Sequence, residues 1–472
     1  MAPASAGDGG RSVAATPTLE TLFVAVIALL GLRLGLRPIG DNSTFVHLRT
    51  GIDIVDGLGV PRRDPYSFTA AGDPWVVQSW LVSVLYGITD RIAGAAGLVI
   101  LHGVLYAALG WLLGTLARAA TPMRTAAAAL LAVGVGVAYW SPRPLVVGLL
   151  AMGVTVLAVE RRLAPWILVP VAWIWVNSHG SFVLGGVWLV LVIVAASNAD
   201  RRHLVRYLAW FAGGVAFGAV NPIGPRLLLF PFVVVEKRAS FAQVVEWRPP
   251  FPPRNPFVVI AVVSVVVVVV VLATAVVRHR VRLLDLVPSA VFMAMGLLSQ
   301  RNLAAAAVVV APVLGRALRP RAESAHADLH RPPIHRAIAA VIVVAAAVFV
   351  AAAAVGDPLD LDAYPPRRAF DAAAGADRII TTDVVGCYRI LREGRGADVF
   401  IDDRYDLYPE QVIDDYLVLR DGGGRSLQIL DRYRADAVIW PRDAELAAIL
   451  GRNRDWRRAF ADGDWVVYVR GV

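Results

Sequence analysis

The chain has 472 residues, of which 57% are hydrophobic and only 18% are charged, and its formal net charge is +9. Soluble globular proteins contain about 45–50% apolar and about 25% charged residues, so this composition excludes a soluble enzyme, a disordered protein and a collagen-like chain. It indicates a polytopic α-helical membrane protein.

The basic residues are almost all arginine, since Lys237 is the single lysine. In a soluble protein this positive charge would suggest nucleic acid, but in a membrane protein it more often reflects arginine in cytoplasmic loops. We therefore expect no nucleic acid partner. Cys387 is the single cysteine, so we expect no intramolecular disulfide framework.

Apolar runs of span length recur along the chain. The first, at 19–36, has no clear cleavage site, so we interpret it as a signal anchor after a cytoplasmic tail of residues 1–18. Further candidate spans lie at 95–117, 125–140, 145–159, 166–176, 182–197, 205–220, 257–277, 283–298, 303–318 and 337–355. A spanning helix needs about 20 mostly apolar residues, and several of these runs are shorter.

Arginine clusters indicate the orientation, because cytoplasmic loops carry the arginine excess. They lie at 118/124, 161/162, 201/202/206, 278/280/282 and 316/319/321. All of them fall on one side if the short apolar piece at 75–88 does not span, so we interpret that piece as an interfacial or re-entrant helix. This gives about 11 spans, a cytoplasmic N-terminus and an extracytoplasmic C-terminus, although an even number of spans remains open.

The opposite side of the expected transmembrane domain, residues 19–356, collects polar loops. They are 37–74, 141–144, 177–180, 221–226, 236–255 and 299–302, and the first of them belongs to an outer loop at 37–94 with interfacial helices. Ionisable residues at membrane depth are costly and usually serve function or pair with one another. We therefore expect the functional site on this side.

Residues 357–472 are expected to form a soluble extracytoplasmic α/β domain, because the composition changes at Gly356 toward Asp and Arg. The predicted strands are 378–382, 399–403 and 437–440, with a closing hairpin at 456–460 and 465–469. The predicted helices are 386–393, 409–419, 426–433 and 442–450. Alternating strands and helices favour an α/β sandwich.

The first outer loop offers the richest candidate residues. Asp41 directly follows the first span, where a partly desolvated carboxylate is suited to accept a proton. Alternatively, Asp41 or Asn42 simply caps a helix that runs to Gly51. His47 lies six residues after Asp41 and could face the same cavity.

Two arginines in other outer loops could bind a phosphate group. Arg143 stands between two prolines, and Arg301 interrupts two apolar runs. Arginine binds phosphate through paired hydrogen bonds and keeps its charge. The alternative for each is a long side chain that reaches the membrane interface.

The remaining polar candidates carry weaker signals. His179 has no metal-ligand partner at helical spacing, so a hydrogen-bonding role is favoured over zinc. The acidic run 402–406 could bind calcium, but it has no twelve-residue calcium-loop pattern, and a charged turn satisfied by Arg404 is the default interpretation. We therefore expect no metal site and no cofactor; a divalent metal stays open as an alternative that no motif supports.

Several segments in order resemble the bacterial GT-C class of multi-span glycosyltransferases, and most closely a largely uncharacterised branch of it. They are Asp41 with the string 47–51, then 64–67, Arg143-Pro144, 175–180, Asn221-Pro222, Glu246-Trp247, Arg301-Asn302 and 400–408. Together they cover nearly the whole chain. Members of this branch often carry a second acidic residue two positions after the first, but this chain has Ser43 there.

The resemblance implies a polyprenyl-phosphate sugar as donor and a glycan, lipid or protein acceptor at the outer face of a bacterial inner membrane. An inverting transfer would use Asp41 as general base, with His47, Asp64 and His179 lining the site. Arg143 and Arg301 are assigned to the donor phosphate by their chemistry. The alternative is a non-catalytic scaffold or glycolipid-binding protein of envelope assembly; a transporter is disfavoured because no paired, Gly/Pro-broken segments occur in corresponding halves.

Overall fold

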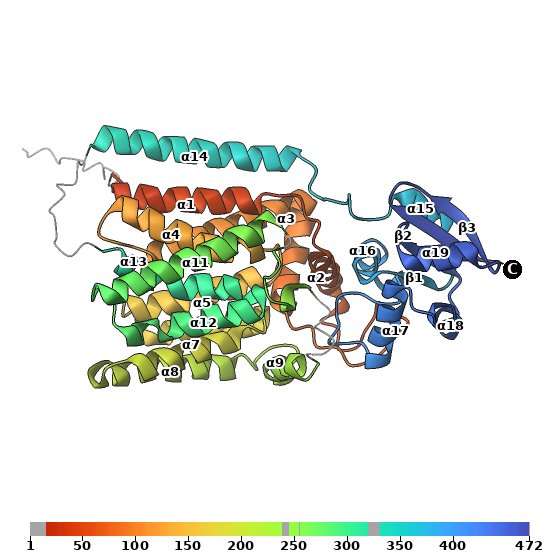
Figure 1. The fold of residues 1–472 in the computed structure, drawn as a ribbon, viewed down its shortest axis with the longest axis horizontal. Helices are drawn as coiled ribbons and strands as arrows, with labels where there is room; N and C mark the ends of the chain where they lie inside the picture. Colours follow the sequence, from red (N-terminus) through yellow and green to blue (C-terminus); the bar gives the residue numbers. More distant parts are fainter. Residues whose placement is uncertain (1–15, 238–244, 254, 320–330, 472) are drawn as a thin grey trace, which may run out of the picture.

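The computed structural model describes residues 16–237, 245–253, 255–319 and 331–471. It is mostly helical, with a small sheet near the C-terminus (Figure 1). The helices before residue 356 are α1 (Leu19–Gly35), α2 (Asn42–Asp53), η1 (Ile54–Leu58), α3 (Trp80–Leu116), α4 (Pro122–Gly136), η2 (Val137–Tyr139), α5 (Leu145–Glu160), η3 (Pro165–Ile167), α6 (Leu168–Ser178), α7 (Phe182–Ala195), α8 (Asn198–Phe217), α9 (Arg226–Glu236), η4 (Val245–Trp247), α11 (Pro256–Val277), η5 (Leu283–Leu286), α12 (Val287–Leu298), η6 (Gln300–Asn302), α13 (Leu303–Ala317) and α14 (Pro332–Val355).

Each of the eleven apolar runs expected from the sequence overlaps one of these helices, and the runs 125–140, 166–176 and 283–298 also include a short helical segment, η2, η3 or η5. Within the described residues, four helical segments are long and apolar enough to cross a membrane: α3, Pro122–Tyr139, α11 and α14. Others are shorter than the roughly 20 residues of a full span, such as α6 with 11 residues and α7 with 14. The membrane-like character of the bundle is therefore clear, and a total of 11 spans stays a prediction.

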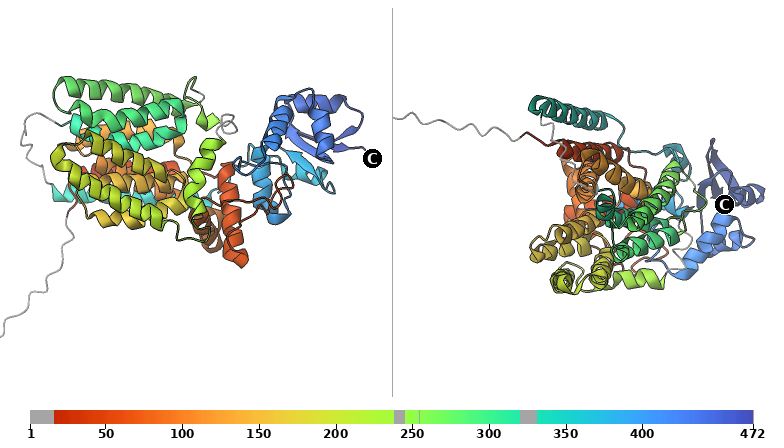
Figure 2. Two further views of the ribbon diagram at one scale, coloured as in Figure 1. Left: turned by 90° about the horizontal axis from the view of Figure 1, so that it is seen from below. Right: turned by 60° about the vertical axis from the view of Figure 1, so that its left-hand side comes forward.

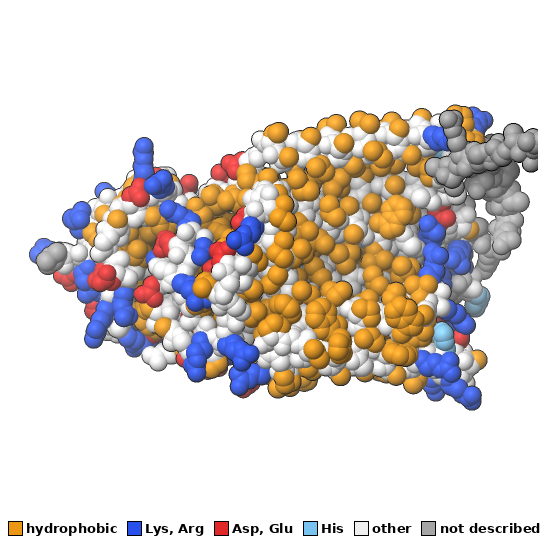
Figure 3. Space-filling model, turned by 180° about the vertical axis from the view of Figure 1, so that it is seen from behind, with side chains coloured by type: hydrophobic (Ala, Val, Ile, Leu, Met, Phe, Trp, Pro, Cys, Tyr) orange, Lys and Arg blue, Asp and Glu red, His pale blue; other side chains and the backbone are white. Residues whose placement is uncertain are grey.

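The core of the bundle is built around α13, in which nearly every residue is buried. By contrast, α14 is mostly exposed to the surroundings of the bundle. It lies along the outside beside α1 (Figure 1), and His335 is its only buried residue. In the view from behind, apolar side chains form a broad band over the bundle (Figure 3). Such a band suits a membrane environment, because lipid replaces water around it.

The arginine clusters gather at the end of the bundle opposite the C-terminal sheet (Figure 3). Ion pairs join several helix ends there, including Arg162–Asp200 at 3.0 Å and Arg316–Glu160 at 2.7 Å. Arg124 also donates to the Leu318 carbonyl at 3.0 Å. The described members of the clusters thus share one end, as the sequence predicted, while Arg321 lies outside the described residues. The assignment of this end to the cytoplasm stays a prediction.

The piece expected as an interfacial helix, 75–88, is mostly the first part of α3. Gly94 breaks this helix with φ 60° and ψ −162°, which separates residues 80–93 from 95–116. Glycine adopts such a positive φ without the strain that a side chain causes. The first part crosses α2 closely: a Cβ added at Gly51 would overlap the Ser83 carbonyl and lie 2.9 Å from the Gly87 nitrogen.

The C-terminal region carries a four-stranded sheet of order β1-β2-β4-β3. Its strands are β1 (Ile379–Thr381), β2 (Ala437–Pro441), β3 (Trp456–Ala461) and β4 (Trp465–Arg470). β1 pairs in parallel with β2, and the other pairs are antiparallel. Its helices are α15 (Arg367–Ala372), α16 (Asp383–Glu393), η7 (Gly394–Gly396), α17 (Glu410–Asp421), α18 (Ser426–Arg432) and α19 (Glu445–Arg452). Figure 2 shows this region set apart from the bundle.

The strand predicted at 399–403 is not part of this sheet, and the prediction was wrong there. Val399 instead pairs with the first loop: its N–H donates to the Tyr66 carbonyl at 2.9 Å, and its carbonyl accepts from Phe68 at 3.1 Å. One apolar core joins the two segments, since Tyr66 and Trp75 pack with Phe400 and its neighbours. The C-terminal region and the first loop therefore share an apolar core, and the domain boundary expected at residue 357 stays a prediction.

Candidate functional site

The candidate site begins with Asp41, which lies directly before α2 between the bundle and the C-terminal region (Figure 1). Its Oδ1 accepts a hydrogen bond from the Thr44 N–H at 3.2 Å and so caps the helix. Both carboxylate oxygens also accept from Nε of Arg143, each at 2.8 Å. The cap that the sequence suggested is thus present, and it coexists with a charged contact to another loop.

Arg143 connects Asp41 to a second carboxylate. Its Nη1 donates to Oε2 of Glu246 at 3.0 Å. Burial lowers the pKa of the guanidinium, but Asp41 and Glu246 reverse this, so that the net pKa lies above its usual range. The side chains of Asp41, Arg143 and Glu246 are 15%, 25% and 35% exposed, so the cluster is partly open to a ligand. We call these three residues the carboxylate–arginine cluster.

Two histidines predicted for the site lie near the carboxylate–arginine cluster. Nδ1 of His47 is 3.3 Å from Oγ of Ser83. Burial and the positive charge of Arg143 lower the pKa of His47 to about 4, against an opposing effect of Asp41. Burial, Arg301, His47 and Arg143 lower the pKa of His179 to about 3. Both imidazoles are therefore neutral at pH 7 and can donate or accept hydrogen bonds without adding charge.

Arg301 extends the cluster on the side of Glu246. Its guanidinium lies 4.5 Å from the ring centroid of Trp247, which is a cation–π contact. Burial lowers the pKa of Arg301, Glu246 raises it, and Arg143 lowers it further. Among the residues that the structure describes, no carboxylate lies within ion-pair distance of Arg301. Its positive charge is thus available to an anionic ligand.

Asp64, which was also predicted for the site, instead contacts Arg404 of the C-terminal region. Its Oδ1 lies 2.7 Å from Nη1 of Arg404, and its carboxylate also accepts from the Tyr66 and Ser67 N–H groups at 3.2 and 3.0 Å. The side chain is fully buried in this network. Asp64 therefore belongs to this buried network and not to the carboxylate–arginine cluster.

The other predicted site residues lie near that cluster. His47 and His179 both feel the charge of Arg143, and His179 also feels that of Arg301.

Asp403 is a residue of the site that was not predicted as one. Its Oδ2 accepts from Nδ2 of Asn42 at 3.4 Å, at the start of α2. Burial and the neighbouring Asp402 raise the pKa of Asp403 to about 7, against an opposing effect of Arg143. The C-terminal region thus adds a carboxyl group beside the carboxylate–arginine cluster. The acidic run after residue 400 was visible in the sequence, but nothing there connected it to Asp41.

One group of side chains in the described part of the chain has metal-ligand chemistry: Cys387, Asp402 and Asp403, whose ligand atoms lie within 4.8 Å of one another. However, Asp402 accepts from Nε and Nη2 of Arg404 at 2.8 and 2.6 Å and from Tyr408 at 2.6 Å. Burial also raises the pKa of the Cys387 thiol, which stays protonated at pH 7. Arg404 and Tyr408 thus already satisfy Asp402 in a charged turn, and the expectation of no metal site stays a prediction.

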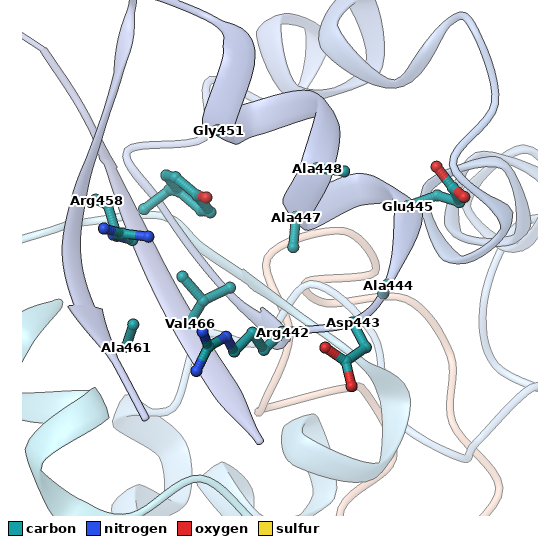
Figure 4. Close-up of a pocket in the computed structure, with 11 residues that line it drawn as sticks. Arg442, Asp443, Ala444, Glu445, Ala447, Ala448, Gly451, Arg458, Ala461 and Val466 are labelled. Carbon is teal, nitrogen blue, oxygen red and sulfur yellow. The ribbon is translucent and has the colours of Figure 1, made fainter. Parts of the chain in front are cut away.

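A hollow of about 340 Å³ lies on the C-terminal region, away from Asp41. It is formed by α19 and the strands β3 and β4 (Figure 4). Its rim carries charges of both signs, from Arg442, Arg458, Asp443 and Glu445, around small side chains such as Ala447 (Figure 4). Among the described residues, none of the buried polar atoms without a hydrogen-bond partner belongs to this lining, so nothing here points to a ligand.

A scan against protein-family models finds no match to this chain, and neither does a search among curated proteins. The geometry of the site therefore carries the functional argument.

Proposed function

We propose that the protein is a multi-span glycosyltransferase of GT-C-like architecture in a bacterial plasma membrane. It would transfer a sugar from a polyprenyl-phosphate donor to a glycan, lipid or protein acceptor, with inversion at the anomeric carbon. In this proposal the arginine-rich end of the bundle is cytoplasmic, and the C-terminal region with the candidate site is extracytoplasmic. About 11 spans would connect the two sides.

The observation that carries the proposal is the carboxylate–arginine cluster at the boundary between the apolar bundle and the C-terminal region. Sugar transfer from a phosphate-linked donor needs a carboxylate to accept a proton and guanidinium groups to bind the phosphate. Asp41 supplies the carboxylate. Arg143 keeps its Nη2 without a hydrogen bond in the described residues, and Arg301 has no carboxylate partner there. Both arginines therefore retain donors for phosphate oxygens.

The proposed reaction proceeds in one displacement. A carboxylate oxygen of Asp41 accepts the proton of the acceptor hydroxyl, whose oxygen forms the new bond to the anomeric carbon. The bond from that carbon to the phosphate oxygen breaks on the opposite face, and polyprenyl phosphate leaves. Arg143 and Arg301 stabilise the charge that develops on the phosphate, and the neutral histidines hydrogen-bond to sugar hydroxyls.

One observation favours the second candidate, a non-catalytic scaffold or glycolipid-binding protein. Both oxygens of Asp41 already contact Arg143, and Oδ1 also caps α2. A carboxylate held in this way can serve structure alone. A donor phosphate bound at Nη2 of Arg143 would draw the guanidinium away from Asp41 and free one carboxylate oxygen. The catalytic proposal requires this step.

The proposal is tested by incubating the purified full chain with a panel of polyprenyl-phosphate sugars and an envelope extract as acceptor source. We expect acceptor-dependent release of polyprenyl phosphate from at least one donor. Arg301→Gln should raise the KM for that donor about tenfold, because a charge-assisted hydrogen bond is lost, and should change kcat little. Binding of polyprenyl phosphate without turnover of any donor would support the scaffold.

A further inference from the structure

A second hollow, of about 290 Å³, lies at the arginine-rich end of the bundle, opposite the C-terminal sheet. Its apolar walls come from α7 and α13, with Trp188, Val192, Val309 and Val313 among the lining residues. Ligand pockets usually measure about 300–1,000 Å³. This hollow is therefore sized for a small polar group and not for a whole lipid.

Three ion pairs form the rim of this hollow. They are Arg162–Asp200 at 3.0 Å, Arg282–Asp285 at 2.6 Å and Arg316–Glu160 at 2.7 Å. The rim thus carries equal numbers of positive and negative charges, although the surrounding end of the bundle is strongly basic (Figure 3). A guanidinium has five N–H donors and a carboxylate about four acceptor sites, so each pair can still bind a charged ligand.

The lining of the hollow contains polar atoms that have no hydrogen-bond partner. Ser289 on α12 is 1% exposed, and its Oγ makes no hydrogen bond in the described residues. Nε2 of His203 on α8 is also buried and without a partner there. Both residues line the hollow. Buried polar groups in folded proteins nearly always have partners, so two unpaired groups in one hollow point to a polar ligand.

The charge pattern selects the ligand. A phosphate suits the arginines, and a primary ammonium, with three donors, suits the carboxylates. The hollow lies where the apolar band meets the polar end of the bundle, at which pockets between helices receive lipid headgroups. We propose that it binds the zwitterionic headgroup of a phospholipid with a primary ammonium group. The phosphate contacts the arginines, the ammonium contacts the carboxylates, and the acyl chains lie against the apolar band.

This site is independent of sugar transfer, and its test uses lipid binding alone. The full chain is purified in detergent and titrated with phosphatidylethanolamine, phosphatidylcholine or phosphatidylglycerol, and bound lipid is measured by native mass spectrometry. We expect phosphatidylethanolamine to bind about tenfold more tightly than the other two, because only its ammonium donates to the carboxylates. Equal binding of the three lipids would overturn the proposal.

Glycerophosphoethanolamine, which carries the same headgroup without acyl chains, distinguishes a lipid from a soluble ligand. We expect it to compete with phosphatidylethanolamine only weakly, because it lacks the apolar chains. Competition as strong as that of the lipid would show that the hollow binds a soluble zwitterion and would contradict a lipid site.

A matched pair of variants tests the charge balance. Glu160→Gln removes one acceptor for the ammonium and leaves the rim with one excess positive charge, so the preference should change from phosphatidylethanolamine to phosphatidylglycerol. Glu20→Gln is the control, because Glu20 also contacts an arginine at this end, Arg118 at 3.8 Å, and is equally exposed, 33% against 32% for Glu160. An unchanged preference in Glu160→Gln, or the same change in both variants, would refute the proposal.

Discussion

At the scale of single residues, the site is organised by the guanidinium of Arg143. It contacts Asp41 and Glu246, which come from loops about 100 residues before and after it. Partial burial strengthens these contacts, because charges interact more strongly away from water. In the proposed reaction, a donor phosphate would enter a site in which positive and negative groups already lie in place, and its binding to Arg143 would free an oxygen of Asp41 for proton transfer.

Asp403 provides a prediction at this scale. Its pKa of about 7 in the folded chain lies above the ordinary value of 3.8. The folded state therefore holds the proton more tightly than the unfolded state, and stability falls as the pH rises from about 4 to about 7. Asp403→Asn removes this loss. Its melting temperature in detergent should exceed that of the wild type by roughly 2–4 °C at pH 8 and match it near pH 4.

The control for this measurement is Asp443→Asn, which changes an exposed carboxylate in the same region. That variant should follow the wild type at both pH values. A constant difference between Asp403→Asn and the wild type across the pH range would contradict the account.

At the scale of elements, the apolar helices were predictable because burial in a membrane requires long apolar runs. The strand expected at 399–403 does not form, because Val399 pairs with Ser67 in the first loop and not with a strand of its own region. Asp41, Arg143 and Arg301 could be found from their chemistry at loop positions. The role of Asp403 could not, because its contact with Asn42 joins residues 361 positions apart.

The crossing of α2 and α3 provides the prediction for this scale. Gly51→Ala would place a Cβ against the Ser83 carbonyl, so α2 must shift, and overpacking of this kind costs about 1–3 kcal/mol. Because Asp41 caps α2, we expect donor turnover to fall together with stability. Gly213→Ala on α8 is the control, since an added Cβ there meets no atom within 4 Å. Thermal unfolding that is the same in both variants would contradict a tight crossing.

At the scale of the whole molecule, the first loop and the C-terminal region act as one unit at the end of the bundle. Arg404 connects them, with Asp64 from the loop at 2.7 Å and Asp402 from its own region at 2.6 Å, and its guanidinium lies 4.5 Å from the Trp75 ring centroid. The sequence predicted two separate parts because composition changes at Gly356. Composition does not reveal that the loop supplies part of the second core.

Arg404→Met tests this connection. It leaves the buried carboxylates of Asp64 and Asp402 without their partner, which costs about 3–5 kcal/mol. Arg420→Met removes an exposed pair with Asp421 and should cost less than about 1 kcal/mol. We expect the first variant alone to lower the unfolding midpoint and to make the C-terminal region sensitive to protease. Equal unfolding midpoints and equal protease sensitivity of the two variants would show that the contacts of Arg404 contribute little to stability.

The most direct test of the proposed function is donor turnover by Asp41→Asn in the purified full chain. Asparagine caps a helix as well as aspartate does, so the fold should persist, but it cannot accept the proton, and turnover should fall at least about 100-fold. Asp56→Asn, an exposed change in the same loop, should retain activity. Unchanged turnover in Asp41→Asn would contradict the assignment of Asp41 as the general base and would leave it as a helix cap.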